Sequence, residues 1–554
     1  MEEEPANCHH CDNPLTKPEI SAHISPISTS TSRQGLSSSH AAAVHDAVSA
    51  TIADIAQIGQ DIARYRLVAE RIEHKQELLE SLAKTHKALL APILRLPSEV
   101  LSEIFLQCIT IPGIDQSLWT NSTFPFENTP LRLASVCRPW RAVALAHSRL
   151  WSSISLTIHP KECKRHIALL ELYFLRSRST PLCINLQDCC RDNINDFKSQ
   201  TLLYRNDMQC LMRVVVAKSE CWERIRFQML SKSMWRTLCP AMGFSLPMLA
   251  SVELDLFEQE DPTDHEPIHV FQSAPRLRHL HIQGAESGSW RQSFTIPWHQ
   301  IQELILADLD WELSQDILDI LMVACNIVRC DLTLYAEPHE RFAPPPIFSQ
   351  NARAVHLPTL QSFALRAMNW INPTGFLSRL HMPAVEELSL ELRDVRVHNW
   401  PEASLNREFM FIASSNRLRK FSLTWTGQRG GTAEEDAIQL IRVSPELREL
   451  HLLGDKYPFK SATILGILAE LDSTRAPLFA PNIEILTFRF TNFDDLSPFV
   501  AAMELRSSPG SRSKLRTINL ESDRELHEQL APPAKWTVEK RLRDIGVHAQ
   551  FSKY

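Results

Sequence analysis

Glycine is the residue that this sequence lacks most clearly. The chain has 14 Gly in 554 residues, where average usage would give about 39. Because Gly supplies the left-handed backbone of phosphate-binding loops, its scarcity disfavours nucleotide-binding folds. The motifs G-x-x-x-x-G-K-[ST], G-x-G-x-x-G, G-x-S-x-G and H-E-x-x-H are missing as well. We therefore expect a chain that is not an enzyme and uses no cofactor.

Long apolar runs and a strong excess of one charge are also missing. No stretch approaches the roughly 20 apolar residues that cross a bilayer, and no secretory apolar segment follows Met1. The 58 Lys and Arg nearly balance the 65 Asp and Glu, giving a net charge of −7. The thirteen Cys are scattered without a disulfide framework. We expect an intracellular protein of the cytoplasm or nucleus with no membrane partner.

The length predicts either three or four ordinary domains or one long repeat array. Residues 1–44 form a Ser/Thr-rich tail that we expect to be disordered, because it cannot bury enough apolar surface to offset its ordering entropy. Within this tail, Cys8 and Cys11 have the spacing of half a zinc site, but no second pair follows. We therefore predict no metal.

Residues 45–91 predict a long amphipathic helix with coiled-coil character, because helix formers carry apolar residues in a seven-residue repeat. Two polar seam positions weaken the repeat, and Pro92 ends it. Either the helix self-associates through this seam, or the seam packs inside its own chain. The seam consists of Ile55, Ile62, Ala69, Gln76, Ala83 and Leu90 at position a, and Ile58, Tyr65, Ile72, Leu79, His86 and Ile93 at position d.

Residues 92–158 predict a small helical module whose apolar stripes call for a partner surface. The sequence LPSEVLSEIF opens a short helix near Pro97 or Ser98, and after a polar connector LASVCRPW supplies a second stripe that Leu150-Trp151 closes. This ordered set, LP-x-E-V-L-x-x-I-F, L-x-x-V-C-x-x-W and L-W, resembles the F-box family. The chain is similar to the F-box proteins with leucine-rich repeats that are abundant in mushroom-type fungi, although its connector is longer than in compact F-boxes.

The resemblance implies that the module binds a Skp-type adaptor, which links an F-box subunit to a cullin. Recognition would then rest on a helix in a groove with a few central anchors. About half of these positions, Val100 and Ile104 especially, could instead be the module's own core. The residues that the resemblance assigns to the adaptor interface are Leu96, Pro97, Glu99, Val100, Leu101, Ile104, Phe105, Val136, Cys137 and Trp140.

Residues 159–535 carry a recurring L-x-x-L-x-L pattern, followed by a C-terminal cap or tail at 536–554. From Leu249 onward the pattern returns every 24 to 36 residues, often after a Pro. Such self-similarity is typical of a leucine-rich repeat solenoid. We expect an α/β repeat fold of mixed helices and strands: the long helix, the all-α module, then an irregular right-handed solenoid with a parallel sheet. The paired thiols Cys189/Cys190 and Cys325/Cys330 are interpreted as buried or incidental.

Strand alternation predicts which side chains face outward on the concave side of this solenoid. The outward set has eight acids and four bases, which disfavours nucleic acid and favours a protein partner with a basic segment. His279, His281 and His451 are too scattered to hold a metal. The candidate target-binding residues are Glu253, Asp255, His279, His281, Glu303, Arg329, Asp331, Arg366, Glu387, Glu391, Lys420, Glu449 and His451.

Three function classes follow. The leading hypothesis is a substrate-receptor subunit of a cullin-type ubiquitin ligase, a non-catalytic chain that binds the adaptor, the cullin complex and an unknown target protein. The second is a scaffold or interaction protein that uses an F-box-like module outside ubiquitin transfer. The third is a hydrolase whose nucleophile and base are hidden in the irregular repeats.

Overall fold

The structure is a computed structural model, and it separates into two units, residues 1–101 and 102–554. The residues described are 38–89, 92–109, 129–158, 162–188, 197–228, 245–255, 268–284, 294–336, 354–368, 371, 373–393, 417–426, 438, 440–455, 461–489, 496–508, 510–522 and 532–553.

The first unit is dominated by one helix, α1 (Ser38–Leu89), of 52 residues. At 1.5 Å per residue this helix is about 78 Å long. It begins before the predicted residue 45, because residues 41–43 are all Ala, the strongest helix former. A short 3₁₀ turn, η1 (Pro92–Arg95), follows, and α2 (Ser98–Gln107) begins in this unit, where Pro97 and Glu99 predict a helix start.

The second unit opens with the rest of α2 and two more helices, α3 (Thr129–Val136) and α4 (Arg138–Ala146). Cys137 separates α3 from α4 in extended conformation, and the Arg141 side chain spans the break by donating from Nε to the carbonyl of Ala134 over 2.8 Å. A 3₁₀ turn, η3 (Ser148–Trp151), ends the module with Trp151 fully buried. The Trp151 indole donates to the carbonyl of Ala144, 2.8 Å away, which holds η3 against α4.

Beyond this module, the described strands form one large parallel sheet whose spatial order follows chain order. Two further strands, β8 (Val355–His356) and β10 (Leu380–His381), pair with each other instead. The fourteen strands of the large sheet are β1 (Ser153–Ile158), β2 (Leu182–Asp188), β3 (Trp222–Gln228), β4 (Ser251–Asp255), β5 (His279–Gln283), β6 (Glu303–Asp310), β7 (Arg329–Tyr335), β9 (Ser362–Ala367), β11 (Glu387–Arg393), β12 (Lys420–Thr426), β13 (Glu449–Asp455), β14 (Ile485–Arg489), β15 (Thr517–Ser522) and β16 (His548–Lys553).

The strands exist because apolar side chains alternate with polar ones. On β4, for example, Val252 and Leu254 are buried whereas their neighbours are partly exposed. The last two apolar residues of each of the ten L-x-x-L-x-L triplets from Leu249 onward lie on ten neighbouring strands, in register with one another, and the first precedes its strand. The parallel sheet that the repeat pattern predicts is therefore present.

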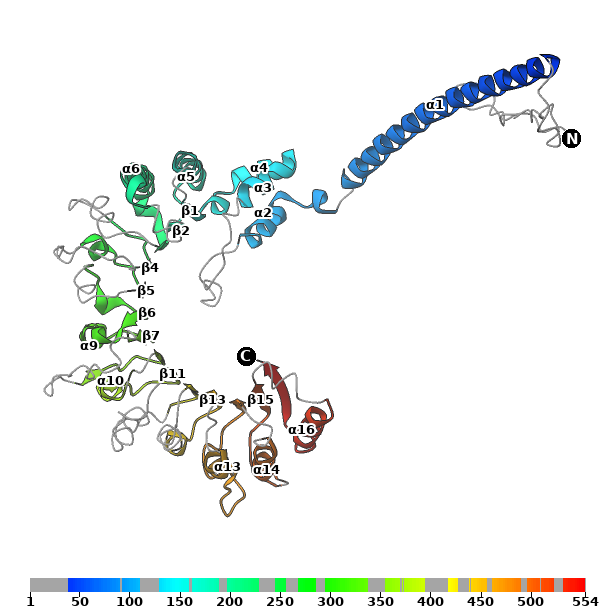
Figure 1. Cartoon of the computed structure of the whole chain (residues 1–554). Coiled ribbons are helices and arrows are strands. Elements are labelled where there is room, and N and C mark those ends of the chain that lie inside the picture. The colour runs from blue at the N-terminus through cyan, green and yellow to red at the C-terminus, as the bar shows by residue number, and fades with distance from the viewer. Residues whose placement is uncertain are drawn as a thin grey trace. The chain divides into compact units, whose positions relative to one another are not determined.

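Helices and 3₁₀ turns connect the strands, and Figure 1 shows the labelled helices of these connections along one side of the sheet. Those helices meet one another as well as the sheet. Arg541 on α16 donates two hydrogen bonds of 2.8 and 2.7 Å to the Glu504 carboxylate on α14. The connecting elements are α5 (Cys163–Ser177), α6 (Phe197–Val216), η6 (Ser219–Cys221), η7 (Val270–Ser273), η8 (Trp298–Gln300), η9 (Trp311–Leu313), α9 (Ser314–Val323), α10 (Thr374–Leu377), α13 (Ser461–Ala469), α14 (Leu496–Arg506) and α16 (Pro532–Asp544).

The ends of the sheet differ from the predicted boundaries. Strand β1, at residues 153–158, pairs with β2 and so belongs to the sheet rather than to the helical module. The predicted cap or tail at 536–554 contains most of α16 and a complete strand, β16, that pairs with β15. Trp151, Ile154 and Leu156 fill the three apolar positions of the pattern at β1, whereas Gly546 and Ala549 stand at the first two positions for β16.

Candidate binding surfaces

The first candidate surface is the set of outward side chains on β3–β16, on the side of the sheet opposite the helices; we call it the sheet face. In parallel strands, residues in register lie side by side, so their side chains meet across neighbouring strands. All thirteen residues that the sequence nominates for target binding lie on this face. The structure assembles most of them into ion-paired clusters.

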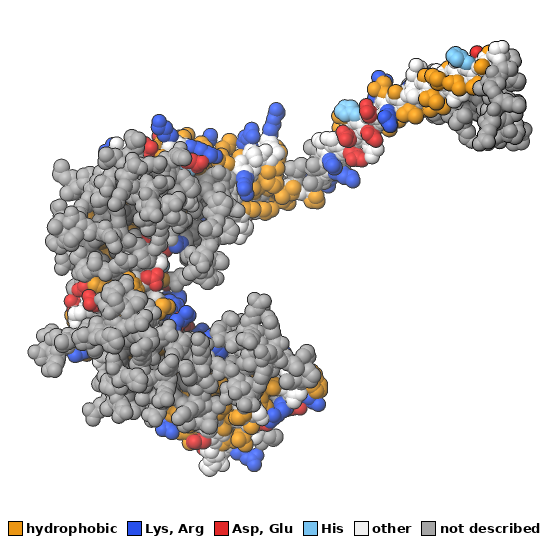
Figure 2. Space-filling view, viewed as in Figure 1, with side chains coloured by type: hydrophobic (Ala, Val, Ile, Leu, Met, Phe, Trp, Pro, Cys, Tyr) orange, Lys and Arg blue, Asp and Glu red, His pale blue; other side chains and the backbone are white. Residues whose placement is uncertain are grey.

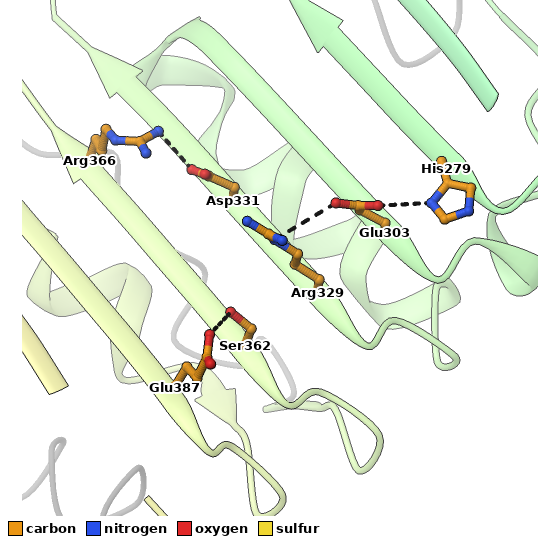
Figure 3. A network of polar contacts seen from close by, with 7 residues as sticks. All are labelled: His279, Glu303, Arg329, Asp331, Ser362, Arg366 and Glu387. Carbon is orange, nitrogen blue, oxygen red and sulfur yellow. Dashed lines mark hydrogen bonds and ion pairs between the residues drawn. The ribbon is translucent and has the colours of Figure 1, made fainter. Parts of the chain in front are cut away.

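The Glu303 carboxylate on β6 is the centre of one cluster (Figure 3). His279 Nδ1 on β5 lies 2.8 Å from Glu303 Oε2, and Arg329 Nε on β7 lies 3.7 Å from Oε1. The carboxylate is thus held between two basic side chains from the strands on either side. A partner protein that approaches Glu303 therefore finds its carboxylate already in contact with His279 and Arg329.

Arg366 on β9 bridges a second cluster. Its guanidinium lies 3.0 Å from Asp331 on β7 and 3.3 Å from Glu391 on β11. Burial raises the pKa of the Asp331 carboxyl, and the positive charges of Arg366 and Arg329 oppose that rise. Asp331 is almost fully buried, so its ionised form depends on Arg366. In Figure 3, Ser362 and Glu387 form the next contact along the sheet.

A third cluster lies on β3–β5 and includes an arginine absent from the predicted set. Arg226 Nε lies 2.9 Å from Glu253 Oε1, and His281 Nδ1 lies 3.3 Å from the same oxygen. Burial lowers the pKa of Arg226, while Glu253 and Asp255 oppose the change. The largely covered Arg226 guanidinium therefore relies on its acidic neighbours, as Asp331 relies on Arg366.

A fourth cluster joins β12 and β13, where Lys420 Nζ lies 3.3 Å from Glu449 Oε2 and His451 Nε2 lies 3.6 Å from the same oxygen. The contact with Glu449 favours protonated His451, but burial and the charge of Lys420 prevail and lower the His451 pKa. Farther along, Arg489 on β14 pairs with Glu521 on β15 over 2.9 Å.

These clusters change the predicted charge of the sheet face. Arg224 and Arg226 on β3 lie in register with Ser251 and Glu253 on β4. They add two bases to the four of the predicted outward set, and Arg393, which alternates with Glu387 and Glu391 on β11, adds a third, against the eight acids of that set. Most of those acids already contact a base on a neighbouring strand, so the face alternates in sign. No pattern within the sequence signals these pairs, because register between strands about thirty residues apart decides which charges meet.

The second candidate surface lies on the helical module. Along α2, Val100 and Ile104 are one turn apart and exposed, whereas Leu101 and Phe105 are buried. Among the described residues, the core positions of α2 are therefore Leu101 and Phe105, and Val100 and Ile104 lie on the surface. Leu96, Pro97 and Glu99 are exposed, and Cys137 and Trp140 are partly exposed. Val136, at the end of α3, is 59% exposed.

The module thus separates an inner from an outer set of apolar side chains. Phe105 packs against Trp140 inside it. No protein-family model matches this chain, and neither does any curated protein. Any role of the exposed apolar side chains is therefore inferred from their exposure and from the sequence motif that contains them.

Among the described residues, no three His, Cys, Asp or Glu side chains converge on a point that could hold a metal ion. Cys330 is buried, and burial raises its thiol pKa, whereas Cys325 is exposed. The predictions for Cys8, Cys11, Cys189 and Cys190 lie outside the described residues. None of the described helices combines the length and apolar content needed to cross a bilayer.

Proposed function

We propose that the chain is a substrate-receptor subunit of a cullin-type ubiquitin ligase. In this proposal the α2–α4 module is an F-box that binds a Skp-type adaptor, and the parallel sheet belongs to an irregular leucine-rich repeat solenoid that binds a target protein. The chain would act by bringing a target close to the transfer machinery rather than by supplying reacting groups.

The observation that carries the proposal is the exposure of motif residues. Apolar side chains normally enter the core, so exposed Leu96, Val100 and Ile104 on and just before one short helix leave apolar area for a partner. At about 25 cal/mol per Å², covering such side chains is the main favourable term of helix-in-groove binding. Leu101 and Phe105, which are buried, would support the interface from behind.

The sheet face supports the second half of the proposal. Its rows of alternating charge disfavour a phosphate backbone, which needs a uniformly basic track. A protein partner with both signs of charge would exchange its own ion pairs with those of the Arg366 and Glu303 clusters. The partner predicted from sequence, one with a basic segment, fits this balanced face less well than a partner of mixed charge.

Co-precipitation tests adaptor binding. Full-length chain carrying Leu96→Ala with Pro97→Ala, or Val136→Asp, is expected to lose the Skp-type adaptor and the cullin from the eluate. Leu175→Asp on α5 is the matched control, because Leu175 is 71% exposed and lies outside the module. Unchanged recovery with the module variants would refute the proposal, and recovery of adaptor without cullin would favour a scaffold outside ubiquitin transfer.

Target binding is tested separately by proximity labelling of the full chain in cells. Arg366→Ala should lose labelled partners, because it leaves Asp331 and Glu391 without their shared base. Arg419→Ala is the matched control. It removes an exposed ion pair with Glu386 that lies outside the sheet face, so this variant should keep its labelled partners. Equal loss with both variants would argue against the sheet face.

A further inference from the structure

We infer that α1 forms a parallel, in-register, two-stranded coiled coil with α1 of a second copy of this chain. The inference is independent of the proposed function, since it concerns only the first unit. Its basis is the exposed seam of α1, the polar residue within that seam and the charges that border it.

Most of the seam of α1 is exposed in the single chain, although Ile58 is half-buried. The side chains of Ile55, Ile62, Tyr65, Ile72 and Leu79 are between 47% and 64% exposed, and Figure 2 shows apolar side chains on the surface of α1. The a and d positions of the seam recur with a spacing of three and four over five heptads, from residue 55 to residue 89. A seam of this length meets the span that a stable coiled coil needs.

Gln76 decides the orientation and the register. It occupies an a position in the middle of the seam, where a buried amide requires a partner. In a parallel, in-register pair the two copies of Gln76 meet and can hydrogen-bond to each other. In an antiparallel pair each a residue meets a d residue, and near full overlap Gln76 would face Tyr65 or Ile72. In the single chain its amide instead donates to Glu80 over 2.9 Å.

The charges bordering the seam fit the same arrangement. In a parallel coiled coil, a g residue of one helix meets the e residue five positions later on the other. Here Asp61 meets Arg66, and Lys75 meets Glu80, so both of these charged g-e pairs are of opposite sign. Two other g residues, Val68 and Leu82, are apolar and face a Glu and a Lys, whose stems can cover them.

Sedimentation equilibrium of the full chain tests the seam. The unaltered chain is expected to be a dimer, and Ile62→Asp with Ile72→Asp should raise the dimer dissociation constant by at least about tenfold, equal to about 1.4 kcal/mol. Leu67→Asp with Leu78→Asp is the matched control, because these leucines are equally exposed but lie at f and c, outside the seam. A monomer or a trimer, or equal loss with both double variants, would overturn the inference.

A charge exchange tests orientation. Lys75→Glu alone brings two glutamates together at this g-e pair, and Glu80→Lys alone brings two lysines together, so each variant should dimerise more weakly. In a parallel heterodimer of the two variants, one helix carries both glutamates and the other carries both lysines, so both g-e pairs have opposite charge again. Differently tagged copies of the two variants should therefore co-purify preferentially. Random mixing, or a mixture as weak as its components, would refute the parallel register. A tail folded onto α1, or a different partner protein, would leave the purified chain monomeric and would also overturn the inference.

Discussion

Phe105 of α2 meets Trp140 of α4 edge to face, with ring centroids 4.9 Å apart and an interplanar angle of 60°. Such pairs contribute about 0.5–1.5 kcal/mol beyond the area they bury. Since Phe105 is 1% exposed, the pair ties α2 to the rest of the helical module. The residues of the motif therefore fall into two groups, those buried in the core of the module and those exposed on its surface.

Phe105→Ala should destabilise this module by roughly 3–5 kcal/mol, because it opens a cavity beside Trp140. Val136→Ala should change stability by no more than about 0.5 kcal/mol, because Val136 is exposed. Hydrogen exchange of the α4 backbone amides measures both effects in the full chain. Similar exchange in the two variants would contradict the division into inner and outer residues.

Arg506 on α14 is a buried cation that binds backbone carbonyls at the C-terminal end of α13 and in the segment that follows it. Its guanidinium donates to the carbonyls of Leu468, Phe479 and Ala480 at 2.7, 3.2 and 2.5 Å. Burial lowers its pKa to about 10, so it stays charged at neutral pH. Arg506→Leu would leave these carbonyls without their donor and should cost roughly 3 kcal/mol or more.

Two measurements check this prediction: chemical unfolding of the full chain, and hydrogen exchange of the α13 backbone amides. Arg512→Leu is the matched control, because Arg512 is exposed and nearby in sequence, and it should change stability by no more than about 0.5 kcal/mol. Equal effects of the two substitutions would mean that the carbonyl contacts add nothing to stability.

His451 should make the sheet less stable in acid. Its pKa is lowered in the folded chain, chiefly by burial and then by Lys420. As pH falls through the ordinary range of His, near 6.5, the unfolded chain takes up this proton first, which favours unfolding. His451→Gln removes that contribution, so the variant should lose less stability between pH 7 and pH 5. Urea unfolding at both values measures the difference, and a larger loss in the variant would reverse the sign.

Two glycines with open space around them should respond to alanine in opposite ways. No described atom lies within 4 Å of the position that a new Cβ would occupy at Gly59 or Gly546. Gly59 lies inside α1, where Ala should stabilise the helix by about 1 kcal/mol. Gly546 has φ +80°, and Ala should cost about 1–2 kcal/mol there.

The two readouts are the thermal melt of helical circular dichroism for Gly59→Ala and hydrogen exchange of β16 for Gly546→Ala. Shifts in the same direction would show that backbone conformation does not control these positions.

The sequence pattern marks most strands of the large sheet but misses β2 and β16, for a physical reason. Where all three apolar positions are filled, alternation alone places the strand. In β2, Pro181 stands where the first leucine of the pattern should be, so the pattern does not mark this strand. In β16, Gly546 and Ala549 replace the first two leucines. These strands form because a neighbouring strand offers hydrogen bonds, which no local pattern records.

For the candidate surfaces, the sequence identifies the outward residues but not their partners. Alternation places Glu303 and Asp331 on the sheet face, whereas their contacts with His279, Arg329 and Arg366 depend on register. On α2 the motif is visible in the sequence, but which of its apolar residues are exposed depends on how the module packs. Tertiary structure decides both.

The agreement between strand order and chain order also governs how the second unit can come apart. Within the described part of the large sheet, each strand hydrogen-bonds only to the strands before and after it. None of these strands locks a distant segment in place, so a pulling force applied to the C-terminus would peel β16 first and then β15, one at a time. The unit should therefore unravel in many small steps under load and reform from whatever strands remain.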